Sequence, residues 1–366
     1  MHRSSAAARI AGVVFLAGIC MSAAAAPAGG YKVGERHLTA SDATAALRDA
    51  EHHDTVRVTV WYPAAKSAKE ERIDLGQPGK PFFIVGASAP DAAFADAKPK
   101  PVILLSHGFG GTARMMGWFG LALAKAGYVV IGVDHPGNNG QDKMTAAGAF
   151  LFWDRVQDLR AALAAAKADP LIGPQLDLAR LGVSGFSAGG FTTLAAAGAK
   201  VDMNGLFAFC HAHPADGECV PQKEFAVTMD EAQRVLASPQ IAPEAAHASD
   251  DHAIAGVRAA FAIAPAIVPA LTGDGMAAMK VPVAILLGDA DPVATPENNG
   301  LVAAKAIPGA RLKVLAGVGH YDFLSNCTPA GAAATPLCTA KVPQDKTHKA
   351  AIAMALGFFA RTLGPR

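Results

Sequence analysis

Short runs of hydrophobic residues recur along the chain, separated by longer Ala-rich or polar stretches. The short runs have the length of buried β-strands, roughly four to eight residues, and several longer stretches repeat apolar residues at helical spacing. Because strands and helices alternate from residue 102 onward, the pattern predicts an α/β fold with a doubly wound, mostly parallel sheet. The predicted strands are residues 31–38, 56–62, 102–105, 128–133, 181–186, 257–264, 281–287 and 311–315. The predicted helices are residues 112–126, 150–167, 191–199, 297–306 and 347–363.

Two segments interrupt this alternation. Residues 64–100 are rich in Ala, Lys, Asp, Gly and Pro, and we expect a long connection with little more than a short strand at 82–85. Residues 202–256 contain several prolines and a charged, helix-favouring stretch at 227–236. An insertion of this size is either a lid or substrate wall, or a solvated decoration without a role.

The composition is that of one large domain and gives no sign of a nucleic-acid-binding protein. The chain has 366 residues, of which 51% are hydrophobic, so residues 27–366 can form a single α/β domain with a substantial core. The net charge of +1 provides no electrostatic footprint for nucleic acid or for an anionic membrane surface. We therefore expect no nucleic-acid partner and no stable membrane anchor, and nothing in the sequence indicates an oligomeric state.

The N-terminus has the pattern of a signal peptide at residues 1–26. Basic residues come first, and an apolar run at 10–21 follows that is too short to span a bilayer. Small residues at 22–26 then provide a signal-peptidase site. The alternative is a lipoprotein anchor at Cys20, which the bulky Ile19 before it disfavours. The pattern predicts a secreted or periplasmic protein.

Export to an oxidising compartment changes the interpretation of the cysteines. After removal of the signal peptide the chain keeps Cys210, Cys219, Cys327 and Cys338, and an even count predicts disulfides. Of the three possible connectivities, two local pairs, 210–219 and 327–338, are the most economical. A metal site at residues 210–213 is the rival interpretation, but it lacks a second well-spaced ligand pair.

The strongest chemical signal is the pattern G-x-S-x-G at residues 185–189. A predicted strand runs directly into it and an Ala-rich predicted helix follows it. In this arrangement the serine sits on a sharp strand-to-helix turn with its hydroxyl projecting from the sheet edge, and the glycines leave room for the neighbouring backbone. The pattern predicts that Ser187 is a nucleophile.

A nucleophilic serine needs a base to take its proton and an acid to orient that base. His320 follows the last predicted strand and is flanked by glycine, so we expect it to be the base. Asp291 leaves the strand at 281–287 and precedes Pro292, which stiffens its turn, so we expect it to be the acid. Asp289 and Asp274 remain alternatives for the acid.

A tetrahedral oxyanion needs two hydrogen-bond donors near the nucleophile. The backbone N–H of Ala188, directly after Ser187, is the first candidate. The turn after the strand at 102–105 should provide the second, and Phe109 is the best candidate there. His107 in the same turn is expected to be structural, and His135, which precedes Ser187 in the chain, is either structural or part of the pocket wall.

Taken in order, these pieces resemble the α/β-hydrolase superfamily and, more narrowly, the secreted bacterial serine esterases related to platelet-activating-factor acetylhydrolase and dienelactone hydrolase. The resemblance implies carboxylic ester hydrolysis through an acyl-enzyme, with the triad Ser187, Asp291 and His320 and without a cofactor or metal. The matching segments are residues 60–63, 105–111, 134–137, 185–189, 264–266 and 319–324, with Cys327.

The resulting hypothesis is a secreted serine ester hydrolase acting on a small-molecule, lipid or polymer ester. An acyltransferase or thioesterase with the same triad is an alternative, because the fold does not determine the reaction. A non-catalytic binding module on the hydrolase fold is the rival from another class, and the presence of all three triad residues in order disfavours it.

Overall fold

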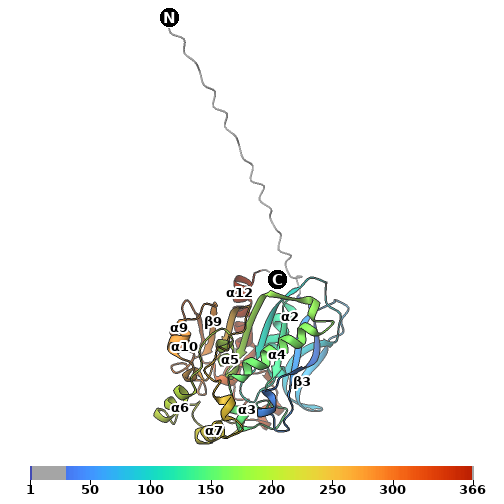
Figure 1. Ribbon diagram of the computed structural model, residues 1–366. Helices are drawn as coiled ribbons and strands as arrows, with labels where there is room; N and C mark the ends of the chain where they lie inside the picture. Colours follow the sequence, from blue (N-terminus) through green and yellow to red (C-terminus); the bar gives the residue numbers. More distant parts are fainter. Residues whose placement is uncertain (2–29, 365–366) are drawn as a thin grey trace.

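The computed structural model describes Met1 and residues 30–364, so the predicted signal peptide lies outside the described residues except for Met1. The described residues form an 11-stranded sheet with helices on both faces (Figure 1). Its strands are β1 (Lys32–Ser41), β2 (Thr55–Ala64), β3 (Glu71–Gln77), β4 (Lys80–Pro90), β5 (Lys100–Ser106), β6 (Val129–Asp134), β7 (Leu176–Phe186), β8 (Val257–Ile263), β9 (Val283–Gly288), β10 (Arg311–Leu315) and β11 (Asn326–Cys327). The α-helices are α1 (Ala45–Arg48), α2 (Gly117–Lys125), α3 (Ala146–Phe150), α4 (Asp154–Ala168), α5 (Ala188–Ala196), α6 (Met203–Ala212), α7 (Met229–Leu236), α8 (Ala242–Ala245), α9 (Gly273–Ala277), α10 (Gly300–Ala306), α11 (Pro329–Ala334) and α12 (Gln344–Thr362).

The sheet has a parallel half and a mixed half. Strands β10, β9, β8, β7, β5 and β6 lie side by side in that order and run parallel. β2 joins β6 antiparallel, and β1 pairs with β2 antiparallel along its whole length. The mostly parallel α/β sheet agrees with the prediction. The carboxyl ends of the parallel strands therefore meet along one edge of the sheet.

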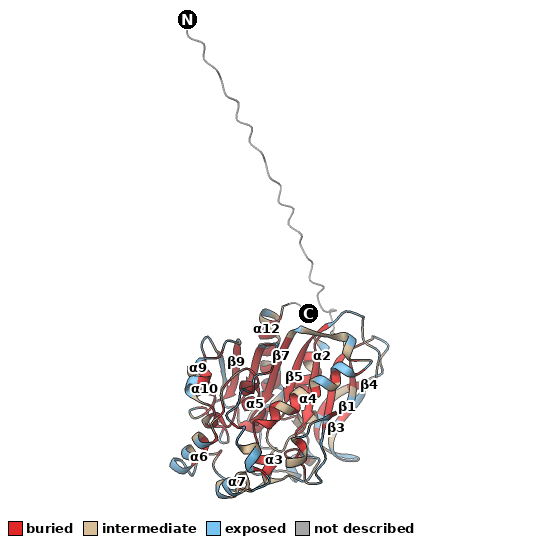
Figure 2. Ribbon diagram, in the orientation of Figure 1, coloured by how far each residue is buried: buried red, intermediate tan, exposed pale blue. Residues whose placement is uncertain are grey.

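Alternate residues of each central strand face opposite layers of the core. On β5, Val102 and Leu104 belong to the cluster that includes the buried faces of α4 and α5. Ile103 and Leu105 belong to the other cluster, which includes residues of α2 and α12. Both faces are covered by helices, so the central strands are buried throughout, as Figure 2 shows by their red colour. This explains why these strands are continuous apolar runs.

The expectation for residues 64–100 is wrong. Instead of a connection with one short strand, this segment forms the antiparallel hairpin β3–β4, and β4 also pairs with β1 and β11. The hairpin turns at Pro78 and Gly79, where Gly79 has φ +73°. Most of β3 is exposed, so its polar side chains conceal the strand in a hydrophobicity pattern.

Two predicted helices have different limits in the structure. The helix expected at 112–126 begins with a 3-10 turn, Arg114–Met116, and continues as α2. The N–H of Met115 in this turn donates a hydrogen bond to the Thr112 hydroxyl. The helix expected at 150–167 is divided into α3 and α4. Residues 150–153 are Phe, Leu, Phe and Trp, and all four are buried, which one face of a continuous helix cannot achieve.

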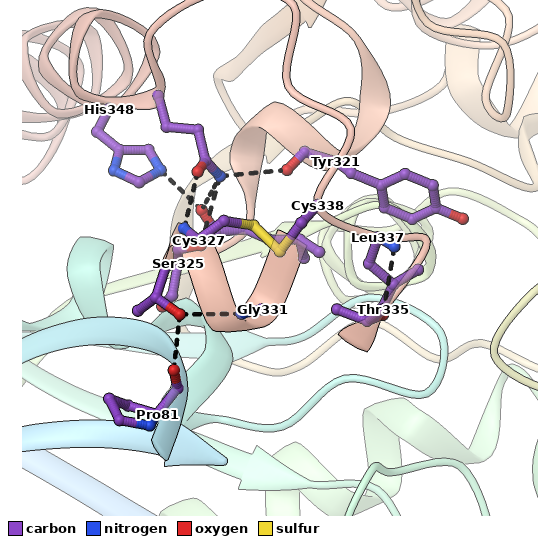
Figure 3. The surroundings of a disulfide bond; sticks show 12 residues. Pro81, Tyr321, Ser325, Cys327, Gly331, Thr335, Leu337, Cys338 and His348 are labelled. Carbon is purple, nitrogen blue, oxygen red and sulfur yellow. Dashed lines mark hydrogen bonds between the residues drawn. A yellow bond between two sulfur atoms is a disulfide. The ribbon is translucent and has the colours of Figure 1, made fainter. Parts of the chain in front are cut away.

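Residues 202–256 form the expected insertion, with α6, α7 and α8 and a stretch without helix or strand between α6 and α7. Cys210 and Cys219 are paired within it, and Cys327 and Cys338 are paired near the C-terminus (Figure 3). Both are the local pairs that were predicted from the sequence. Within residues 30–364 no helix is long and apolar enough to cross a membrane.

Candidate active site

Ser187 stands between β7 and α5 in a strained backbone conformation. Its φ is +57° and its ψ is −120°, a region that non-glycine residues rarely adopt and that is concentrated at functional sites. The glycines of the motif are required by contact. A Cβ on Gly189 would lie 2.1 Å from the carbonyl oxygen of Ser106, and one on Gly185 would lie 2.2 Å from that of Gly189. The local sequence therefore forces a sharp turn that raises the serine above the sheet edge.

The structure brings the three predicted triad residues together. The Ser187 Oγ atom lies 2.8 Å from Nε2 of His320, and Nδ1 of His320 lies 2.6 Å from Oδ2 of Asp291. The second carboxylate oxygen of Asp291 accepts hydrogen bonds from the N–H groups of Val293 and Ala294, both at 2.9 Å. These bonds fix the carboxylate, which in turn orients the imidazole so that Nε2 faces the serine hydroxyl. All three triad side chains are buried.

The other two candidate acids lie elsewhere. Asp289 Oδ1 accepts a 2.6 Å hydrogen bond from the N–H of Gly317 and so closes the turn beside the His320 loop. Asp274 is an exposed residue in the first turn of α9. Neither contributes a contact to His320, whereas Asp291 does.

The two predicted oxyanion donors flank the nucleophile. Phe109 and Ala188 line the same cavity as Ser187. Within residues 30–364 neither of their backbone N–H groups has a hydrogen-bond partner, whereas the next N–H along the turn, that of Gly110, is bonded to Asn138. An unpaired N–H beside a serine nucleophile is available to an oxyanion.

A buried network of charged residues beneath the turn was not foreseen from the sequence. His135 is bonded through Nδ1 to Asp158 and through Nε2 to the Ser106 hydroxyl, at 2.7 and 2.8 Å. Arg48 donates two 2.8 Å hydrogen bonds to the same carboxylate of Asp158, and Arg155 donates to the carbonyl oxygen of His107. The pKa of His135 is lowered well below its ordinary value by burial and by the two arginines. His135 is thus a neutral structural residue of this network, which supports the turn that carries Phe109.

Two cavities meet at Ser187. The first, which we call the apolar pocket, has a volume of about 60 Å³. Its wall is mostly aromatic and aliphatic and includes Phe150, Phe152, Leu206, Phe225 and Val227. The second, which we call the histidine-side pocket, has a volume of about 50 Å³. It contains His320 and the turn at 108–111 and is more polar.

The insertion provides part of both walls. Its residues in the apolar pocket are Leu206, Glu218, Val220, Gln222, Phe225, Val227 and Met229, and Gln222 and Glu224 reach the histidine-side pocket. The insertion thus lies against the site rather than apart from it. Which of its residues would touch Ser187 could not be read from the sequence, because a segment without regular structure has no periodicity to place them.

Glu218 is the most unusual of these wall residues. It is almost fully buried, and burial raises its pKa to about 8 even though its Oε1 atom accepts a hydrogen bond from the backbone N–H of Ile267. Ile267 follows β8 with φ +60°, in the loop whose Ala266 N–H donates to the Ser187 carbonyl oxygen. Glu218 therefore ties the insertion to the loop behind the nucleophile.

The described residues contain no group of three or more His, Cys, Asp or Glu side chains placed to hold a metal ion. The metal interpretation of residues 210–213 is also opposed by the disulfide, which takes both Cys210 and Cys219. Acid–base and nucleophilic groups are the chemistry that the site's own residues offer.

Residues 97–324 match the family model described as "Serine aminopeptidase, S33", a segment that includes Ser187, Asp291 and His320. The chain belongs to this family. It is thereby a member of the α/β-hydrolase superfamily, as its fold also indicates. Among solved structures, a ferulic acid esterase from Streptomyces cinnamoneus is similar, with a TM-score of 0.59 and 20% sequence identity over 92% of each chain. At this identity the likeness concerns the fold alone. A search of curated proteins finds no match.

Proposed function

We propose that this chain is a secreted serine hydrolase that cleaves small carboxylic esters through an acyl-enzyme intermediate. The observation that carries the proposal is the continuous contact from Asp291 through His320 to Ser187, at 2.6 and 2.8 Å. A buried nucleophile, base and acid in this geometry, with two free N–H groups beside them, are the parts that acyl transfer requires.

In the proposed reaction the Ser187 Oγ attacks the ester carbonyl carbon while Nε2 of His320 takes the hydroxyl proton. The carbonyl electron pair moves onto its oxygen, and the N–H groups of Phe109 and Ala188 stabilise that oxyanion, each contributing about 3–4 kcal/mol. The oxyanion collapses, the C–O bond to the alcohol breaks, and the alcohol leaves with the proton from His320. Water then repeats the sequence, with His320 again as base, and releases the acid.

The two pockets indicate how the ester is oriented at Ser187. The leaving alcohol must receive its proton from His320, which lines the histidine-side pocket and not the apolar pocket. The acyl group therefore takes the apolar pocket. Because this pocket is small, at about 60 Å³, and its wall is apolar, we infer that short apolar acyl groups fit better than long ones.

Secretion is part of the same proposal. The two disulfides support secretion, because disulfides persist in oxidising compartments and are rare in the reducing cytosol. The signal-peptide pattern at residues 1–26 supports it independently. The narrower likeness to the acetylhydrolase and dienelactone hydrolase group is also proposed on the quoted segments, with Ser187 where dienelactone hydrolases have cysteine.

The description of the matched family names a peptidase, so amide cleavage is the second candidate. The same triad and oxyanion donors act on amides, and the discrimination lies in the substrate. Transfer of the acyl group to an alcohol or thiol in place of water is a variant of the same chemistry.

The test uses purified mature protein with p-nitrophenyl acetate, butyrate, octanoate and palmitate, and with aminoacyl p-nitroanilides. We expect turnover of the esters with a maximum near butyrate, and a loss of about 10⁶ in kcat for Ser187→Ala. Turnover of the anilides alone would assign the peptidase activity. No turnover of either class, with no labelling of Ser187 by a phosphonate, would indicate a binding module.

A further inference from the structure

The histidine-side pocket contains a carboxyl group that the proposed mechanism does not use. Glu224 comes from the insertion and lies against the turn that carries Phe109: a Cβ on Gly110 would be 2.8 Å from the Glu224 Cβ. The residue lines the pocket together with His320 and Tyr321. Because Asp291 already occupies Nδ1 of His320, Glu224 is not the triad acid.

The Oε2 atom of Glu224 is buried and has no hydrogen-bond partner within the described residues. Burial raises the pKa of Glu224, and the nearby His320 and the Tyr321 hydroxyl oppose this rise. Buried carboxylate oxygens normally have partners, and one without a partner in a native structure calls for an explanation, such as a ligand.

The insertion also places the Gln222 side chain here, and the donor end of that side chain is already satisfied. The side-chain Nε2 of Gln222 donates to the carbonyl oxygens of Gly217 and Val220, both at 2.8 Å. Tyr321 is held in place by its neighbours. Its ring contacts the ring of His320. The Nζ atom of Lys223 also lies 5.5 Å from the centroid of the Tyr321 ring. Oε2 of Glu224 is therefore a buried acceptor of this wall that has no partner within the described residues.

The position of this acceptor matters because of where the alcohol must lie. His320 gives its proton to the leaving oxygen, so the rest of the alcohol occupies the histidine-side pocket, which has a volume of about 50 Å³. Its other walls are formed partly by Leu324 and Leu337, the latter on the loop closed by the Cys327–Cys338 disulfide (Figure 3). A small alcohol there would meet apolar atoms on these walls and one free acceptor on Glu224.

We infer that Glu224 is a specificity-determining residue, which selects monoesters of small diols or polyols by accepting a hydrogen bond from the second hydroxyl of the alcohol. The inference rests on the proposed ester hydrolysis, since it concerns the leaving group of that reaction. The Tyr321 hydroxyl interacts with the same carboxyl group. A monohydric alcohol of the same size would leave the buried oxygen unpaired, and such sites reject substrates that lack the required hydroxyl.

The experiment compares 2-hydroxyethyl butyrate with propyl butyrate, which share an acyl group and differ by a hydroxyl in place of a methyl. For the unmodified protein we expect kcat/KM to be about 10–100-fold higher for the hydroxyethyl ester. In Glu224→Met this preference should disappear, because the substitution removes both the acceptor for the second hydroxyl and the unpaired oxygen that penalises propyl butyrate. Glu224→Gln, which keeps an acceptor oxygen, should retain part of it. Asp230→Asn, an exposed acid in α7 of the same insertion, is the matched control and should keep it fully.

Equal kcat/KM for the two esters in the unmodified protein would overturn the inference, as would an undiminished preference in a folded Glu224→Met variant. The comparison in the unmodified protein decides the matter if that variant does not fold. p-Nitrophenyl butyrate serves as the reference substrate. If it is cleaved while the two alkyl esters are not distinguished, only the role of Glu224 fails; if no ester is cleaved, the proposed function fails with it.

Discussion

Replacing Arg48 by Met tests the buried network under the candidate oxyanion turn. Arg48 is 1% exposed and donates two hydrogen bonds of 2.8 Å to Asp158, whose side chain is also fully buried. Its Nε lies 3.6 Å from Asp154 and its Nη2 lies 3.5 Å from Asp42. Met has a similar length but no charge, so the substitution leaves Asp158 buried without its ion-pair partner.

Breaking a buried ion pair by removing one partner typically costs 3–5 kcal/mol. We expect a loss of that size in the free energy of unfolding of Arg48→Met at pH 8, measured by urea denaturation with circular dichroism. Asp154 should add less than Asp158, because burial raises its pKa to about 8 and it is only partly ionised at this pH. The control is Arg72→Met, whose side chain is 60% exposed and pairs with Asp74; it should change the free energy by less than about 0.5 kcal/mol.

The network also predicts how this loss depends on pH. Arg48 is one of the groups that lower the pKa of His135, which donates to the same Asp158 carboxylate. Without Arg48 the folded-state pKa of His135 rises, so His135 can take up a proton and replace part of the missing charge. The stability gained this way is present at low pH and lost as pH rises. The deficit of Arg48→Met should therefore be smaller at pH 5.5 than at pH 8. A deficit below about 1 kcal/mol, or one that grows as pH falls, would refute this reasoning.

Three further measurements address the site and its supports. Asp291→Asn should lower kcat by about 10⁴, by placing His320 in the wrong tautomer, and Asp289→Asn should change it by less than tenfold; a reversed result would move the acid. Replacing the Cys210–Cys219 pair by Ser should lower the free energy of unfolding by about 2.5–3 kcal/mol in the chain-entropy model, and unchanged stability would contradict it. Burial raises the pKa of Glu218 to about 8 from an ordinary 4.5, so the folded state keeps a proton that the unfolded state has released. Stability should fall as pH rises from about 4.5 to 8, and Glu218→Gln should flatten this slope in urea titrations.

The sequence predicted those parts of the site that depend on the backbone and on the order of strands. Ser187 could be placed because a strand, a turn and a helix follow one another within a few residues, and that local geometry determines where its hydroxyl points. His320 and Asp291 could be placed because both follow parallel strands, whose carboxyl ends meet at one edge. In the structure these three side chains are in contact with one another.

Partnerships between distant side chains could not be predicted in this way. Arg48 and Asp158 are separated by 110 positions, and nothing near either residue signals the other. The hairpin β3–β4 was missed for a different reason: its first strand is mostly exposed and polar, and only Ile73 and Leu75 alternate as apolar positions, which is too short a pattern to reveal a strand. The Pro78-Gly79 turn was the available signal.

The insertion combines both cases, because it lines the pockets on each side of Ser187, the candidate nucleophile that the core positions. Phe109, Gln222 and Val293 line both pockets and so separate them at Ser187. Glu218 and Glu224 come from the same short stretch, yet one lines the apolar pocket and the other the histidine-side pocket. Under the proposed function, a change of sequence there would alter the preference for acyl group and alcohol separately, while the strands that hold the serine, aspartate and histidine stay the same. This division explains why the reaction could be inferred from motifs, whereas the substrate had to be argued from the cavities.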